Sequence, residues 1–137
     1  LLLHLRKTYM KKTLFMDKYP IHSLTLYKEK LQYKSMTQLV EYFKEKITTH
    51  PVAHFIAIFD HYAHTKALGG EIMEGLKDVQ NVVFCFGSAI PSTSMVAVRP
   101  RSIGICEFED RFVIEFMEAP KEELHAVMQA WVKALVE

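Results

Sequence analysis

Histidines gather in one short part of the sequence, where they accompany an aspartate. Four of the chain's seven histidines lie between positions 50 and 64, namely His50, His54, His61 and His64. Asp60 directly precedes His61, and a helical turn would place His61 and His64 on one face. Imidazole and carboxylate groups bind transition metals and also perform general acid–base catalysis. The spacing therefore raises the hypothesis of a metal-binding protein or enzyme that uses Asp60, His61 and His64.

A structural explanation is favoured for the same residues. An aspartate at the end of a strand typically caps the next turn or helix by accepting hydrogen bonds from backbone N–H groups. The sequence has no HExxH or other named metal motif, and no nucleophile is fixed in sequence beside Asp60 and His61. We expect Asp60 to organise the following turn and His61 to face a crevice, with metal binding as the alternative.

Two further segments carry groups that suit an anion. Gly87 and Ser88 follow an apolar stretch, and a glycine there lets the backbone approach a ligand. The lysine and the spacing of a P-loop are missing, so nucleotide hydrolysis is not indicated. Arg99 and Arg101 flank a proline, and two guanidinium groups held in this way can bind a phosphate or a carboxylate. The alternatives are a plain connecting loop at Gly87 and surface salt bridges for the two arginines.

Apolar periodicity and turn residues predict the elements that carry these groups. Ser35, a capping-box glutamine and an apolar stripe at helical spacing predict a helix that ends before Pro51. The run VAHFIAIF at 52–59 is almost continuously apolar and predicts a central strand covered on both faces. Further strands are predicted at 21–28, 81–86, 101–108 and 111–118. Helices are predicted around 72–79 and from 119 onward. A helical turn or loop is predicted at 61–68, and residues 94–98 fit either a strand or a helix.

This order of elements predicts one α+β domain over residues 21–137. Its expected form is a sandwich with a mixed or antiparallel sheet covered by two main helices. A ferredoxin-like arrangement is one way to connect the elements, whereas a Rossmann domain is disfavoured because no GxGxxG follows a strand. Residues 1–20 are expected to form an N-terminal segment. The sequence around Met10 reads like a natural bacterial start, so residues 1–9 are candidates for upstream or cloning-derived sequence.

The composition narrows the class of protein. A formal net charge of +1 over 137 residues does not indicate nucleic acid binding. No apolar run approaches the ~18 residues of a membrane span, and the N-terminal leucines precede the basic residues, which is the wrong order for a secretory signal. Cys85 and Cys106 lie far apart in apolar stretches, as is typical of buried thiols in a reducing compartment. We therefore expect a cytoplasmic protein without membrane segments.

Several short stretches, taken in order, resemble a known family. They are FIAIFDH at 55–61, ALGG at 67–70, VFCFG at 83–87, Pro100 and the hairpin that runs to Pro120. The series resembles the bacterial domain-of-unknown-function family 302. The resemblance implies a compact α+β domain that often forms a dimer and has no established activity, and it matches Asp60, His61 and Gly87 to recurrent features of that family. The chain departs from the family after Gly87, where it reads SAIP.

These observations favour a non-catalytic, cytoplasmic small-ligand-binding or regulatory domain that forms a homodimer. Its ligand-binding residues are predicted to be Asp60, His61, Gly87, Ser88, Arg99 and Arg101, and the two arginines favour an anionic ligand. The hypothesis requires the 60–64 segment and the 86–88 loop to lie at the same end of the sheet. The alternatives are the metal site or enzyme at Asp60, His61 and His64, and a dimeric protein-interaction module. The sequence identifies no cofactor.

Overall fold

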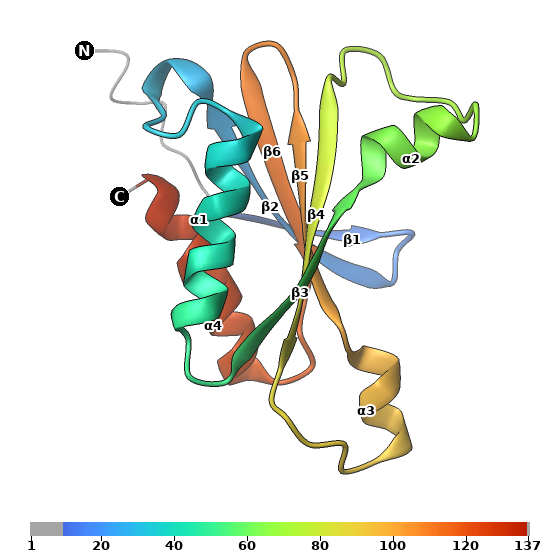
Figure 1. The fold of residues 1–137 in the computed structure, drawn as a ribbon, viewed down its shortest axis with the longest axis vertical. Helices are drawn as coiled ribbons and strands as arrows, with labels where there is room; N and C mark the ends of the chain where they lie inside the picture. Colours follow the sequence, from blue (N-terminus) through green and yellow to red (C-terminus); the bar gives the residue numbers. More distant parts are fainter. Residues whose placement is uncertain (1–9, 137) are drawn as a thin grey trace.

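The computed structural model describes residues 10–136 and contains one open, six-stranded sheet in which all neighbouring strands are antiparallel. The strand order across the sheet is β1-β2-β6-β5-β4-β3 (Figure 1). The α+β class is therefore confirmed, with an antiparallel sheet. The proposed origin of residues 1–9 lies outside the described part of the chain. The strands are β1 (Lys11–Phe15), β2 (Tyr19–Tyr27), β3 (Ala53–Asp60), β4 (Asp78–Phe86), β5 (Arg101–Glu107) and β6 (Arg111–Met117).

Two long helices cover the same face of this sheet. They are α1 (Met36–Thr49) and α4 (Glu122–Lys133), which lie side by side in Figure 1. Two short helices, α2 (His61–Ala67) and α3 (Thr93–Val98), lie at opposite ends of the sheet. Single 3-10 turns follow β2 at Lys28–Lys30 and α4 at Ala134–Val136.

The core lies between the two long helices and the sheet. In α1 the predicted apolar stripe is buried, and Ser35 caps the helix by accepting a hydrogen bond of 3.1 Å from the Gln38 backbone N–H. Alternate residues of β2, β5 and β6 are buried, as expected for strands with one covered face. The largest fully buried side chains include Phe43, Phe84 and Phe112. The predicted helix at Ser35 and the predicted hairpin at residues 101–118 are confirmed.

The prediction that residues 52–59 form a central strand is wrong. β3 is an edge strand that pairs only with β4 within the described sheet, and most of its residues are exposed or half-buried. Its register shifts between Phe55 and Ala57, so the bulge turns Ile56 outward, where it is 52% exposed. An apolar run fits an edge strand as well as a central one, because its composition does not report how many neighbours the strand has.

One strand was not predicted, and two local predictions need correction or completion. β1 was not predicted, because the turn that joins it to β2 lacks the Asn-Gly pair that usually marks such hairpins. Met16 and Asp17 adopt the positive φ angles there, at 55° and 59°. The helix predicted around 72–79 is wrong: Gly75 adopts φ 87°, and β4 begins at Asp78. The open alternative at 94–98 resolves to a helix, α3, whose first turn is capped by Ser92.

Candidate functional site

The predicted ligand-binding residues lie in two groups at opposite ends of the sheet. In the β3–β4 pair, Asp60 is opposite Gln80, whereas Ala53 is opposite Phe86. The six residue steps from Gln80 to Phe86 correspond to about 20 Å of strand. The single pocket predicted between the 60–64 segment and the 86–88 loop is therefore wrong. Consecutive antiparallel strands end at opposite ends of the sheet, and the sequence pattern does not show that β3 and β4 are paired in this way.

At one end, Asp60 and the α2 histidines make local contacts. The Asp60 carboxylate accepts a hydrogen bond of 2.9 Å from the Ala63 backbone N–H and so caps α2. A ring nitrogen of His61 is 2.9 Å from the Asn81 side-chain oxygen. Phe59 lies beside both imidazoles, with ring centroids 4.8 Å from His61 and 5.2 Å from His64. Among residues 10–136, the side chains that lie close enough together to share a metal ion are in another part of the fold. The hydrogen bond to the Ala63 N–H fits the predicted capping role of Asp60.

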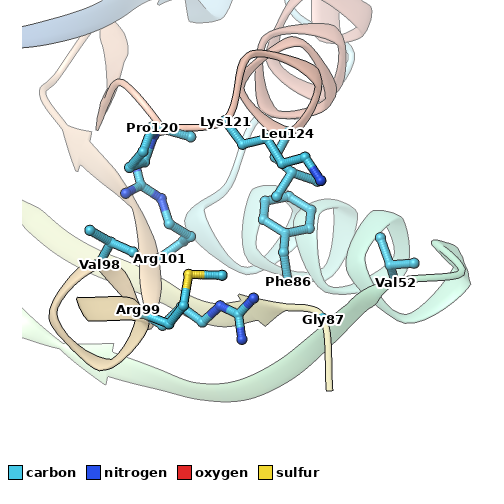
Figure 2. Close-up of a pocket in the computed structure, with 11 residues that line it drawn as sticks. Val52, Phe86, Gly87, Val98, Arg99, Arg101, Pro120, Lys121 and Leu124 are labelled. Atoms are coloured by element: carbon cyan, nitrogen blue, oxygen red, sulfur yellow. The ribbon is translucent and has the colours of Figure 1, made fainter. Parts of the chain in front are cut away.

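At the other end, Gly87, Arg99 and Arg101 line one cavity of about 270 Å³ (Figure 2). Ser88 is exposed and does not line it. The cavity lies where β4 ends, where α3 leads into β5, and where α4 begins. Its wall is mostly apolar, with three basic side chains and no acidic one. The lining residues are Val52, Phe86, Gly87, Met95, Val98, Arg99, Arg101, Ala119, Pro120, Lys121 and Leu124.

Gly87 and the chain around it hold Arg99 in place. Gly87 has φ 79°, a conformation that side-chain-bearing residues rarely adopt, and its N–H donates a hydrogen bond of 2.7 Å to the Val52 carbonyl. A Cβ atom at Gly87 would come within 3.1 Å of an Arg99 guanidinium nitrogen. Arg99 also donates a hydrogen bond of 2.7 Å to the Ala89 carbonyl. The glycine therefore leaves room for the guanidinium group to lie across the backbone.

Arg101 brings a half-buried and incompletely paired guanidinium group to the same cavity. It donates one hydrogen bond to the Met117 carbonyl, while its buried Nε has no hydrogen-bond partner among the described residues. Burial lowers the pKa of Arg101 from its ordinary value. A guanidinium group remains charged at neutral pH even so, and a buried unpaired N–H is costly to leave without an acceptor. An anion in the cavity would supply that acceptor if the Arg101 side chain turned its enclosed Nε toward the cavity.

The first turn of α4 adds a third source of positive potential. Lys121 is the N-cap residue of α4 and makes no side-chain cap hydrogen bond. Helix N-termini favour anions because their first backbone N–H groups lack partners within the helix. Glu122 and Glu123 partly offset this field, and Glu123 pairs with Lys121 at 3.6 Å, but neither glutamate lines the cavity. In the view of Figure 2, the Phe86 ring lies between Leu124 and Arg99.

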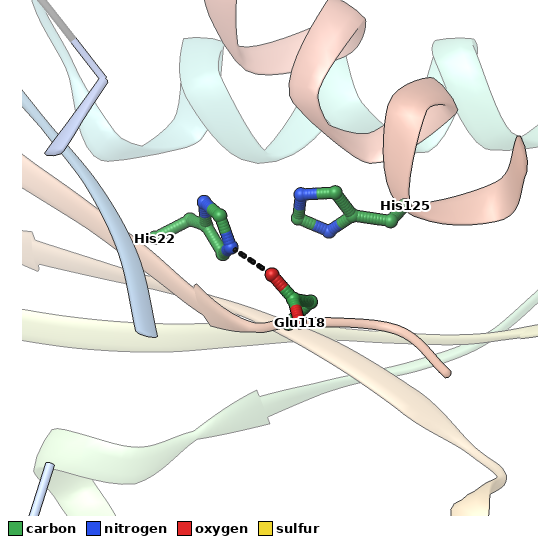
Figure 3. Close-up of side chains that lie close together, drawn as sticks. All are labelled: His22, Glu118 and His125. Atoms are coloured by element: carbon green, nitrogen blue, oxygen red, sulfur yellow. Dashed lines mark hydrogen bonds and ion pairs between the residues drawn. The ribbon is translucent and has the colours of Figure 1, made fainter. Parts of the chain in front are cut away.

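A separate cluster, not predicted from the sequence, lies between the sheet and α4. It consists of His22 on β2, Glu118 just after β6 and His125 on α4 (Figure 3). A ring nitrogen of His22 is 2.9 Å from Glu118 Oε1, and the two imidazole centroids are 4.2 Å apart. Lys12 Nζ lies 3.2 Å from the same carboxylate oxygen. The alternation of β2 contained a signal for this cluster, because it places His22 on the buried face with Leu24.

The electrostatics of this cluster follow from its burial and its neighbours. Hydrogen bonds from His22 and Lys12 lower the pKa of Glu118. Burial, and then the charge of His22, lower the pKa of His125. The Nδ1 atom of His125 is buried and has no hydrogen-bond partner in the described part of the chain. The cluster therefore holds an ionised carboxylate beside a histidine that favours its neutral form.

Comparison with known proteins identifies a family and no characterised relative. No helix within residues 10–136 has the length and apolar character needed to cross a membrane. No curated protein and no solved structure matches the chain. The expected resemblance to family 302 is not confirmed, because the matching family model is a different one, described as "Family of unknown function (DUF6858)", over residues 10–137. The chain therefore belongs to the DUF6858 family of unknown function.

Proposed function

We propose that the protein is a non-catalytic binding domain for a small amphipathic organic anion, which it holds in the cavity beside Gly87. The observation that carries this proposal is the composition of the cavity wall. Arg99, Arg101 and Lys121 line an otherwise apolar space with no acidic side chain. Binding sites for small molecules typically combine an apolar wall with a few polar groups that fix the orientation of the ligand.

The cavity suggests how such a ligand would lie. A carboxylate or similar head group would accept hydrogen bonds from the guanidinium groups of Arg99 and Arg101. An alkyl or aryl tail would pack on Phe86 and Leu124, which form part of the apolar wall. A volume of about 270 Å³ is slightly below the range of drug-sized sites, so the ligand would be small.

Octanoate is a suitable probe, because it joins one carboxylate to a short apolar chain. Trp131, the only tryptophan in the chain, stacks on Phe86 with ring centroids 5.9 Å apart and should report occupancy through its fluorescence. We expect octanoate to change this fluorescence saturably, and octanol and octylamine to bind much more weakly. Equal binding of all three probes would show that the basic side chains do not select the ligand and would contradict the proposal.

Two variants test the site itself. Arg99→Ala removes a proposed head-group donor, and Gly87→Ala places a methyl group against the Arg99 guanidinium. Both should weaken octanoate binding, by on the order of 10-fold for Arg99→Ala if one charged hydrogen bond is lost. Arg111→Ala is the matched control, because Arg111 pairs with Asp110 at the opposite end of the sheet. Octanoate binding that Arg99→Ala leaves unchanged would overturn the proposal.

The expected homodimer and the cytoplasmic location remain predictions. Static light scattering of the purified chain at several concentrations checks the first. A tagged chain imaged or fractionated in its own cell checks the second. Neither result affects the test of the anion cavity, which depends on one chain.

A further inference from the structure

We propose that His22, Glu118 and His125 form a binding site for a divalent transition-metal ion of the Zn²⁺, Co²⁺ or Fe²⁺ type. The inference does not depend on the proposed anion cavity, because none of the three side chains lines that cavity. Two imidazoles with one carboxylate favour these ions, whereas Mg²⁺ and Ca²⁺ favour sites made of oxygen atoms alone.

The three side chains already lie close to the spacing that such an ion needs. One ligand atom from each residue lies within 4.8 Å of the others. Ligand atoms around a tetrahedral Zn²⁺ are about 3.3 Å apart, given metal–ligand distances of about 2.0–2.1 Å. His22 and Glu118, at 2.9 Å, are already near this separation. Closure around an ion therefore requires small side-chain movements, chiefly of His125.

The three ligands come from elements that the fold fixes independently. His22 is opposite Phe116 in the β2–β6 pair, and Glu118 follows two residues after Phe116. His125 projects from α4 toward both, as Figure 3 shows. His22 is only 5% exposed and stacks on Phe116, so its imidazole is held in position. A site built on strands and a helix in this way is preorganised for its ligand.

Two observations point to a missing ligand. The buried Nδ1 of His125 has no hydrogen-bond partner in the described chain, although buried polar atoms in proteins are nearly always paired. Lys12 forms an ion pair with Glu118, and its side chain is 55% exposed on the edge strand β1. This ammonium group can move into solvent when a cation takes its place. Three protein ligands would leave one position on the ion for water or another small ligand.

Cobalt titration tests the site on the full chain, purified without an affinity tag and treated with EDTA. We expect one equivalent of Co²⁺ per chain to give the visible absorption bands of a site with nitrogen ligands, and one equivalent of Zn²⁺ to remove them. No stoichiometric binding of either ion would overturn the proposal.

Four variants show which residues bind the ion. His125→Ala and Glu118→Gln should each weaken Co²⁺ binding by on the order of 100-fold or more, since even indirect partners of metal ligands contribute 10–100-fold. Lys12→Ala should strengthen it, because it removes the competing cation. His61→Ala/His64→Ala is the matched control and should leave binding unchanged. Circular dichroism confirms that each variant is folded.

Two results would overturn the assignment even if cobalt binds. One is unchanged binding in folded His125→Ala, and the other is loss of binding in the His61/His64 control variant. Weaker binding in Lys12→Ala would indicate that Glu118 depends on Lys12 for its position, and would also contradict the proposed competition. A purely structural His22–Glu118 pair predicts no cobalt bands at all.

Discussion

The molecule holds two groups of histidines with an acidic residue, and they differ in how they are assembled. Asp60, His61 and His64 are neighbours in sequence, but each side chain bonds to or stacks on its own local partner at an exposed end of the sheet. His22 and His125 come from nearly opposite ends of the chain and meet over Glu118 on the covered face. The first group is easy to recognise in the sequence, but its side chains do not converge. The side chains of the second group converge on one point, because strand register and helix packing bring them together.

Replacing His22 with alanine should have the largest effect on stability. His22 is 5% exposed, stacks on Phe116 and bonds to Glu118, so the variant leaves a cavity and removes a partly buried hydrogen bond. We expect the free energy of unfolding to fall by about 2–3 kcal/mol. Urea denaturation of the metal-free chain measures it. His64→Ala, at the exposed end, is the control and should cost less than about 0.5 kcal/mol.

If both substitutions had the same effect, the contrast between a buried and an exposed histidine group would be lost. The m-value of each variant shows whether the denatured state has changed instead of the native contacts.

Replacing Asp60 should have a smaller effect that is confined to α2. Asp60→Ala removes the cap at the Ala63 N–H, which typically lowers the free energy of unfolding by about 1 kcal/mol. Asp60→Asn should retain most of this stability, because an amide oxygen can also accept the hydrogen bond. Urea denaturation gives the cost, and amide hydrogen exchange in α2 locates it. A loss of stability spread over α1 and α4 would contradict a purely local role for Asp60.

Acidification should produce the smallest change, and it should depend on the cluster of His22, Glu118 and His125. Burial lowers the pKa of His125 below its ordinary 6.5, as do the charges of His22, Lys12 and Arg101, against the opposing charge of Glu118. The unfolded chain therefore binds this proton at a higher pH than the folded chain. The stability of the metal-free protein should be complete above pH 6.5 and decrease as the pH falls below it.

His125→Gln should flatten this decrease between about pH 7 and 5, as measured by urea denaturation with EDTA present. His61→Ala/His64→Ala should keep the wild-type slope. An unchanged slope in the His125 variant would mean that the acid sensitivity arises elsewhere.

Much of the fold could be predicted from local patterns. The helix after Ser35 and the hairpin at 101–118 are confirmed because capping residues and apolar periodicity act within a few positions along the chain. The position of β3 at the edge of the sheet could not be predicted, because an apolar run such as residues 52–59 does not encode the number of neighbouring strands. The turn at Met16 was missed because its residues do not carry the usual hairpin signal.

The candidate sites divide in the same way. Gly87, Arg99 and Arg101 line one cavity because they flank one connection between neighbouring strands, and their role in binding a ligand stays a prediction. Adding Asp60 and His61 to that pocket failed, because strand direction decides which loops share an end of the sheet. The cluster at His22 required the pairing of β2 with β6, and these strands are separated by most of the chain.

Locating a bound ion tests the proposed metal site most directly. Crystals of the full chain grown with one equivalent of Zn²⁺, measured at the zinc absorption edge, would show its position by anomalous scattering. We predict a single strong peak enclosed by His22, Glu118 and His125. A peak at His61 and His64 instead, or no peak in crystals grown from a solution that contains zinc, would contradict the claim that His22, Glu118 and His125 form the metal site.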